Sequence, residues 1–312
     1  MMIQKKYTKN IDIREDYLLK KDNLLEILLQ DKSTNKNILW ATDSYEKKYG
    51  NIFAPQAEIK TELVTGEFGR LIQPRAVKSK EEQLYRTREK AEVFTPLSIV
   101  KQMNEACDSK RVTKHNWQEY VALLKLEITC GEAPYIVSRY DPVSEKQELL
   151  PLQKRVGFLD RKMRAISKYC DTHIDWVKWT KISFQSSYGY EWQGDSLLIA
   201  RENLLYTFID YYKDKFKKSP SLKLQIEIAE IIVWNIFQMD GLRYVIPMSC
   251  KNEKIIIKGE KNLFGKEDDR IEEKQCEGCE KKVAHMHNGD YVKIMDWVKD
   301  KTIKFVDIVG KQ

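Results

Sequence analysis

An acidic residue followed by a tight turn is the clearest chemical feature of this sequence. The segment from Leu126 to Tyr135 runs from apolar residues through Glu127 and Thr129 to Gly131, and then into residues suited to opening a helix. A turn between a strand and a helix lets backbone N–H groups approach a cofactor, and the first turn of a helix has unpaired donors. We therefore expect the turn at Gly131 to line a cofactor pocket.

A second feature is the segment Phe94-Thr95-Pro96, which precedes the helix-like residues Leu97 to Met103. Thr95 is suited to the N-cap of this helix and Pro96 to its first position. Taken alone, the pattern indicates a capped helix and nothing more.

Two further acidic residues stand where we expect strands to end. Glu191 closes an apolar stretch that begins at Ile182, and a carboxylate in that place can accept two hydrogen bonds from a ribose diol. Glu191 lies 60 positions beyond Gly131, against about 20 in the common dinucleotide-binding pattern, so we expect an inserted helical segment. Asp240 follows the apolar stretch from Ile231. Its carboxylate could bind an adenine amine, although Asp-Gly is equally an ordinary turn.

In their order along the chain, these segments resemble the gamma-type DNA adenine methyltransferases, especially the modification subunits of restriction–modification systems. That family has a Phe-Thr-Pro segment, an Asp-Pro-x-Cys-Gly-x-Gly turn, an acidic strand end with an Ala-Arg-x-Asn-Leu helix, and an Asn-Ile-x-x-Gly-Asp-x-Leu segment. The resemblance covers about residues 91–245. The matching segments here are Phe94 to Pro96, Glu127 to Tyr135, Glu191 with Ala200-Arg201-Glu202-Asn203-Leu204, and Asn235 to Leu242, with Glu127, Ala133 and Met239 in place of an Asp and two Gly residues.

The resemblance implies an α/β fold: a Rossmann-like, S-adenosylmethionine-dependent methyltransferase core with an N-terminal helical and β extension. The Phe-Thr-Pro segment would contact the methionine end of S-adenosylmethionine, and the turn would lie beside its amino group and sugar. Glu191 would bind the ribose and Asp240 the adenine. The cofactor-binding residues implied in this way are Phe94, Thr95, Pro96, Glu127, Thr129, Gly131, Glu191, Trp192 and Asp240.

A departure from the family suggests a split enzyme. The family transfers the methyl group with an Asn/Asp/Ser-Pro-Pro-aromatic tetrapeptide that holds the flipped base, and this sequence has no Pro-Pro pair. The closing strand, residues 302–309, resembles the family's strand that leads into the tetrapeptide. We therefore expect the cofactor-binding subunit of a site-specific DNA adenine-N6 methyltransferase. A second polypeptide would supply the catalytic tetrapeptide and the recognition of double-stranded DNA.

Two alternatives come from other functional classes. The chain could be a non-catalytic module that binds DNA or a defence-system partner through a degenerate cofactor pocket. It could also be a nuclease-bearing restriction subunit, because Asp43 with Glu58-Ile59-Lys60 has the loose spacing of magnesium-dependent nucleases. Such spacing arises often by chance in a chain with 32% charged residues.

A cysteine cluster forms a separate candidate site. Cys276-Glu277-Gly278-Cys279 has the spacing of one half of a zinc site, with Cys250 upstream and His285 or His287 downstream. A Cys₃His set of Cys250, Cys276, Cys279 and His287 would make a closed structural site, and we expect zinc there without a catalytic role. The alternative is an exposed hairpin turn around Gly278.

Helices and strands must hold these candidate residues in place, and the sequence shows alternating helical and strand patterns. We expect an amphipathic helix over residues 14–31, a short strand over 37–42, and a charged helix or linker over 79–90. Strands are expected over 121–128 and 182–191. The expected helices between and after them cover 155–169, the region of Trp176 and Trp179, 197–212 and 222–234. Such alternation predicts a parallel sheet with crossover helices.

The whole chain sets the remaining expectations. We expect three regions: an extension over 1–90, the core over 91–250, and an irregular insertion with the terminal strand of the core over 251–312. No apolar run approaches the roughly 20 residues that span a bilayer, so we expect a cytoplasmic protein with no membrane partner. The net charge of +7 is mild and does not by itself indicate nucleic-acid binding. Arg86, Arg88, Arg161 and Arg164 are candidates for phosphate contacts.

Overall fold

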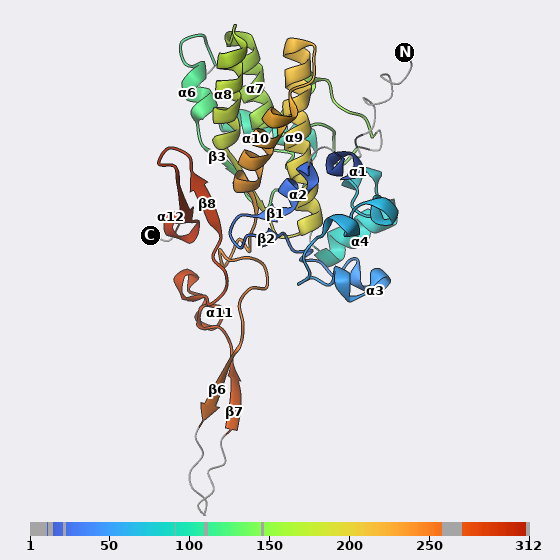
Figure 1. Ribbon diagram of the computed structural model, residues 1–312, viewed down its shortest axis with the longest axis vertical. Coiled ribbons are helices and arrows are strands. Elements are labelled where there is room, and N and C mark those ends of the chain that lie inside the picture. Colours follow the sequence, from blue (N-terminus) through green and yellow to red (C-terminus); the bar gives the residue numbers. More distant parts are fainter. Residues whose placement is uncertain are drawn as a thin grey trace, which may run out of the picture. The chain divides into compact units, whose positions relative to one another are not determined.

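The computed structural model describes residues 11, 15–20, 23–90, 92–108, 112–144, 147–257 and 270–309. The chain divides into two compact units, residues 1–238 and 239–312, which we call the first and the second unit (Figure 1). This division differs from the predicted boundaries at residues 90 and 250. The fold is mixed α/β with a small parallel sheet, as the alternation of patterns predicts.

The parallel sheet of the first unit has three strands in the order β3-β4-β5. They are β3 (Lys125–Glu127), β4 (Ser187–Glu191) and β5 (Ile236–Gln238). Glu127 pairs with Gly189 and Glu191 pairs with Gln238, so the carboxyl ends of the strands meet at one edge. Glu127 and Glu191 therefore lie at the ends of neighbouring strands, whereas the third strand ends at Gln238, before Asp240.

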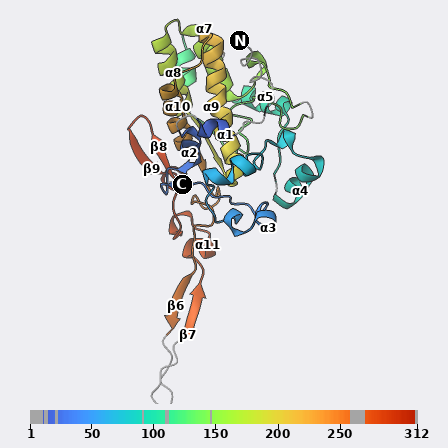
Figure 2. The same ribbon diagram turned by 45° about the vertical axis from the view of Figure 1, so that its right-hand side comes forward.

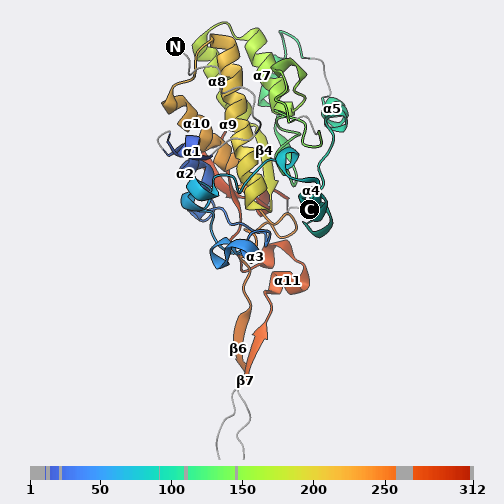
Figure 3. The ribbon, with the colours of Figure 1, turned by 90° about the vertical axis from the view of Figure 1, so that its right-hand side faces the viewer.

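Four helices make the crossovers that parallel strands require. Helices α7 (Phe158–Tyr169) and α8 (His173–Gln185) connect β3 to β4, and α9 (Gly194–Phe216) and α10 (Leu222–Asn235) connect β4 to β5. Helix α9 is buried over most of its length and packs against β4 (Figure 3). Figure 2 shows α7, α8, α9 and α10 gathered into one helical layer. These helices build the core that holds the sheet.

The N-terminal part of the first unit packs on these helices, since α2 contacts both α9 and α10. It also carries several short 3-10 turns between residues 51 and 77. Its elements are α1 (Glu15–Leu19), α2 (Leu24–Leu29), β1 (Gln30–Asp31), β2 (Lys36–Asn37), α3 (Glu46–Tyr49), α4 (Lys80–Lys90), α5 (Leu97–Ala106) and α6 (Trp117–Ala122).

Several predicted elements differ in extent from the observed ones. The helix predicted over 14–31 is broken, because Asn23 has a left-handed backbone with φ 62° and starts α2 anew. The strand predicted over 121–128 begins as α6 and becomes a strand only at Lys125. Residues 182–185 belong to α8 and not to the second strand. Helix α5 begins one residue later than predicted, with Pro96 as its N-cap.

The second unit consists of hairpins and short helices. Strands β6 (Glu253–Ile257) and β7 (Arg270–Lys274) pair in an antiparallel ladder that extends away from α11 (Glu277–Lys281) (Figures 1 and 2). Strands β8 (Lys293–Asp296) and β9 (Lys301–Lys304) form another antiparallel pair, followed by α12 (Val306–Val309). The terminal strand predicted over 302–309 is wrong in its extent and its pairing. It ends at Lys304 and pairs with β8, not with the parallel sheet.

Candidate metal centre and predicted cofactor pocket

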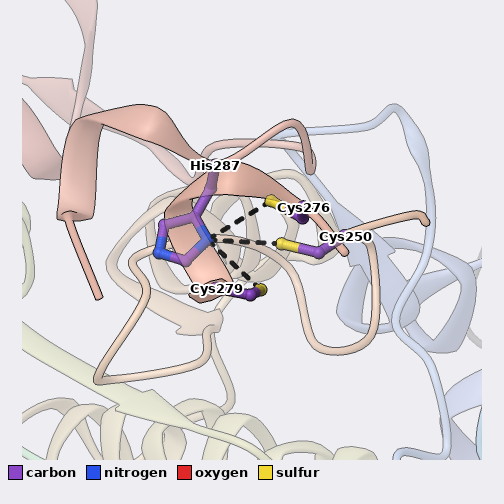
Figure 4. A group of neighbouring side chains, drawn as sticks. All are labelled: Cys250, Cys276, Cys279 and His287. Carbon is purple, nitrogen blue, oxygen red and sulfur yellow. Dashed lines mark hydrogen bonds between the residues drawn. The ribbon is translucent and has the colours of Figure 1, made fainter. Parts of the chain in front are cut away.

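The four predicted metal ligands come together in the second unit. The ligand atoms of Cys250, Cys276, Cys279 and His287 all lie within 4.8 Å of one another. His287 Nδ1 lies 3.5 Å from Cys250 Sγ, 3.8 Å from Cys276 Sγ and 3.6 Å from Cys279 Sγ (Figure 4). The cluster can therefore hold a metal ion, and His287, rather than His285, is the histidine that completes it.

Local structure explains how three separate segments reach this point. Cys276 is the N-cap of α11 and Cys279 lies in its first turn, where the Cys279 N–H donates to the Cys276 carbonyl at 2.9 Å. Residues 244–250 run beside residues 287–292, because Val245 pairs with Tyr291 in an antiparallel bridge. This pairing brings Cys250 beside His287.

Two glycines allow these segments to approach closely. A Cβ atom at Gly278 would lie 2.5 Å from His287 N, and a Cβ at Gly289 would lie 2.5 Å from Ser249 Oγ and 2.9 Å from Cys250 N. Real Cβ atoms do not approach other atoms so closely, so a side chain at either position would push two ligand-bearing segments apart.

The surroundings of Cys276 favour its thiolate form. Burial opposes the thiolate, but hydrogen bonds from the Asn288 and Cys279 backbone and from the His287 side chain outweigh burial and lower the pKa of Cys276 to about 6. The Asn288 N–H donates to Cys276 Sγ at 3.2 Å. Burial and the neighbouring thiols instead raise the pKa of Cys250 to about 12. A metal ion would bind all three sulfurs as thiolates.

Sequence reasoning missed the residues that support the four ligands. The Asn288 side chain accepts from Lys251 N at 3.1 Å and donates to Lys251 O at 2.9 Å, which joins the Cys250 and His287 segments. The Tyr291 hydroxyl accepts from His287 N and donates to Ala284 O, each at 2.9 Å. The turn dipeptide Asn288-Gly289, directly after His287, is the sequence feature that could have indicated these supporting contacts.

The predicted cofactor pocket lies at the carboxyl edge of the parallel sheet. Gly131 N donates to Glu191 Oε2 at 2.8 Å, and a Cβ at Gly131 would lie 3.7 Å from the ring of Phe94. On another side of the turn, the Asn203 side chain donates to Glu132 O at 3.1 Å. The structure thus brings together Phe94 and Gly131 with Glu191 at the end of β4 and Asn203 in α9.

The carboxylates at this edge bind the backbone of the turn. Glu127 accepts from Tyr135 N at 3.3 Å and Ile136 N at 3.0 Å, and Glu191 also accepts from Gln193 N at 3.1 Å. Burial raises the pKa of both carboxyl groups. A carboxylate has about four acceptor sites, and backbone donors at Gly131, Trp192 and Gln193 contact Glu191, so it keeps the capacity for about one further hydrogen bond.

The turn itself has an unusual backbone. Thr129, Gly131 and Ala133 have φ of 46°, 53° and 62°, which is the left-handed region that favours glycine. Such strain clusters at functional sites. The exposed Thr129 donates its hydroxyl to Ile128 O at 2.8 Å. Ala133 thus adopts a left-handed backbone conformation. The turn of the methyltransferases that the sequence resembles has a glycine at this position.

Other predicted pocket residues have their own contacts. The Trp192 indole donates to Ala41 O at 2.9 Å. Thr95 is half-buried and Pro96 is exposed at the start of α5. Asp240 belongs to the second unit, where its carboxylate accepts from Leu242 N and Arg243 N.

Arg86 is not a phosphate contact, because its side chain is buried. It donates to Glu92 Oε1 at 2.6 Å and to Asp195 Oδ2 at 2.8 Å, and the Tyr45 hydroxyl donates to the same Asp195 oxygen at 2.7 Å. Sequence reasoning missed this network. It ties the residues before Phe94 to the helix that follows Glu191.

Two clefts of about 540 and 420 Å³ lie elsewhere in the first unit, and neither is lined by a predicted cofactor residue. Of the residues that the structure describes, only the Cys₃His group forms a metal-competent cluster. Glu58, one residue of the alternative magnesium site, accepts from Asn37 N at 3.1 Å.

Comparison with protein-family models, with curated proteins and with solved structures found no match. Within the described ranges, no helix combines the length and the apolar character needed to cross a bilayer.

Proposed function

We propose that the first unit binds S-adenosylmethionine, as the cofactor subunit of a DNA adenine-N6 methyltransferase with a Rossmann-like core. The observation that supports this most is the convergence of four segments around one turn. Phe94, Gly131 and Asn203 meet there beside Glu191, at the carboxyl edge of three parallel strands. Ligands of open α/β sheets bind at that edge.

Two residues at this edge, Gly131 and Glu191, have properties that would suit a nucleoside. Gly131 leaves the space beside the Phe94 ring free of a Cβ atom, and Glu191 could accept a hydrogen bond from a ribose hydroxyl. The bound cofactor would supply an electrophilic methyl group. The chain's own residues would hold the cofactor and orient it, and such positioning supplies a large part of the rate in group transfer.

The proposed partner is a second polypeptide that carries the catalytic tetrapeptide and reads double-stranded DNA. A gene for such a partner, next to the gene for this chain and encoding Asn-Pro-Pro-Tyr or a close variant, would support the split arrangement. Methyl transfer to adenine in duplex DNA would then require both chains.

In the second unit, we propose that the Cys₃His cluster binds zinc in a structural role. Closed sets of four Cys and His ligands are typical of structural zinc, whereas catalytic zinc keeps one position open for water or substrate. The metal would take no part in methyl transfer.

Calorimetry tests the cofactor proposal directly. The full chain is titrated with S-adenosylmethionine, alone and with the candidate partner, and compared with the variants Phe94→Ala and Glu191→Ala. We expect each variant to bind at least tenfold more weakly. The exposed Glu119→Ala in α6 serves as the control and should bind normally. Absence of binding with and without the partner would refute the proposal and leave a non-catalytic module as the alternative.

A further inference from the structure

The described residues of the second unit form a small apolar core. Among the residues that the structure describes there, the buried apolar side chains apart from the ligand Cys276 are Met239, Val245, Ile246, Val292, Ile294, Phe305 and Val306. The exposed ladder of β6 and β7 adds little to this core, because the described side chains Ile255, Ile256 and Ile271 are 41%, 63% and 67% exposed. Small units of this kind usually need a metal or disulfides for stability.

The cysteine–histidine cluster lies at the point where three segments of the second unit meet, so a bound metal ion would cross-link them. It joins three segments: the end of the stretch that contains Val245 and Ile246, the start of α11, and the segment that leads into Val292. Backbone hydrogen bonds join two of these segments. Ile246 N donates to Asp290 O at 2.8 Å, and Val292 N donates to Tyr244 O at 3.1 Å.

The spacing of the ligand atoms fits a tetrahedral zinc ion. With Zn–S of about 2.3 Å and Zn–N of about 2.0–2.1 Å, tetrahedral geometry places nitrogen and sulfur about 3.6 Å apart. The three distances from His287 Nδ1 to the sulfurs are 3.5, 3.8 and 3.6 Å. Three thiolates and one imidazole suit zinc better than magnesium or calcium, which prefer oxygen ligands.

We infer that one zinc ion, held by Cys250, Cys276, Cys279 and His287, is required for the second unit to fold, whereas the first unit folds without metal. A preformed site rarely exists in an unfolded chain, so the free energy of zinc binding is available as folding free energy. This inference extends the zinc proposal and does not depend on S-adenosylmethionine. Its tests therefore remain valid if the cofactor proposal fails.

Metal analysis and cobalt substitution test the site in the intact chain. We expect one zinc per chain after purification without chelator. Replacement by cobalt should give the intense visible d–d absorption of a tetrahedral thiolate site. A chain that contains no zinc and gives no cobalt spectrum would overturn the inference. A disulfide between two of the three cysteines in the purified protein would also overturn it.

Hydrogen exchange of the full chain tests the folding role. Removal of the metal with a chelator should increase exchange at least tenfold at the amides of Ile246, Asn288 and Val292, while amides of α9 stay protected. Zinc should restore protection. Unchanged exchange in the second unit after complete metal removal would contradict the inference.

Variants separate the site from the other cysteines. Cys279→Ser and His287→Ala should each lower the zinc content well below one per chain and increase exchange in the second unit. Cys107→Ser changes an exposed cysteine outside the cluster and should keep one zinc per chain. If the cluster variants retained full zinc and normal exchange, the four residues would not be the ligands.

Discussion

Among single residues, Arg86 differs most from its sequence-based interpretation. A basic residue on a densely charged segment is usually solvated, but Arg86 is 1% exposed and contacts two carboxylates, those of Glu92 and Asp195. Loss of one partner of such a buried pair leaves an uncompensated charge. Through these contacts Arg86 links Glu92, two residues before Phe94, to Asp195, four residues after Glu191.

We therefore predict that Arg86→Met lowers the free energy of unfolding by about 3–5 kcal/mol. Arg88→Met, an exposed position on the same helix, should change it by about 0.5 kcal/mol or less. Urea unfolding of both variants measures the difference. Equal, small effects would show that the network contributes little to stability.

Asp195 gives the same network a pH dependence. Burial would raise the pKa of Asp195, but the Arg86 guanidinium outweighs burial and lowers this pKa to about 2. A lowered carboxyl pKa stabilises the fold above the unfolded pKa of about 4, and this stabilisation is lost as the pH falls towards 2.

Asp195→Asn removes this titration. The stability difference between the natural chain and Asp195→Asn should shrink by about 2 kcal/mol between pH 5 and pH 2. Urea unfolding at several pH values measures it. A pH-independent difference would show that folding does not lower the pKa of Asp195.

At the scale of elements, α11 and the segment of His287 bring the spaced cysteines and the histidine together into one metal-competent cluster. The four ligands could be predicted because Cys-x-x-Cys, with a cysteine upstream and a histidine downstream, has the spacing of a zinc site. Their supporting contacts could not, since Asn288 and Tyr291 act through tertiary hydrogen bonds. The close packing of α11 against His287 also requires a glycine at position 278, because a Cβ atom there would collide with the His287 backbone.

We predict that Gly278→Ala weakens zinc binding at least tenfold although it changes no ligand. The added methyl group would displace the His287 backbone from the sulfurs. Competition with a chromophoric zinc chelator measures the affinity. An affinity equal to that of the natural chain would mean that the helix can shift without cost.

The sheet shows a similar limit of sequence reasoning. The parallel sheet, with Glu127 and Glu191 at strand ends, could be predicted from the alternation of patterns. The lengths of the strands did not, because β3 keeps only three residues between α6 and the turn. The helix break at Asn23 was also hidden, since its leucines fit one continuous helical period.

At the scale of the whole molecule, the chain has two units with different sources of stability. The first unit buries long helices around a sheet, and the second has a small core and a metal-competent cluster. Six of the seven tryptophans lie in the first unit, so tryptophan fluorescence follows mainly that unit.

We predict two thermal transitions for the zinc-loaded chain. Chelation should remove the calorimetric transition of the second unit and leave the melting curve by tryptophan fluorescence nearly unchanged. A single transition that shifts as a whole on chelation would show instead that the units unfold together.

The most direct test of the proposed cofactor function is photo-cross-linking of radiolabelled S-adenosylmethionine to the full chain, alone and with the candidate partner. Peptide mapping should place the label within residues 92–96 or 129–137, and unlabelled S-adenosylmethionine should compete it away. Absence of specific label in both preparations, or label confined to peptides outside the Gly131 turn and the Phe94 segment, would contradict the account.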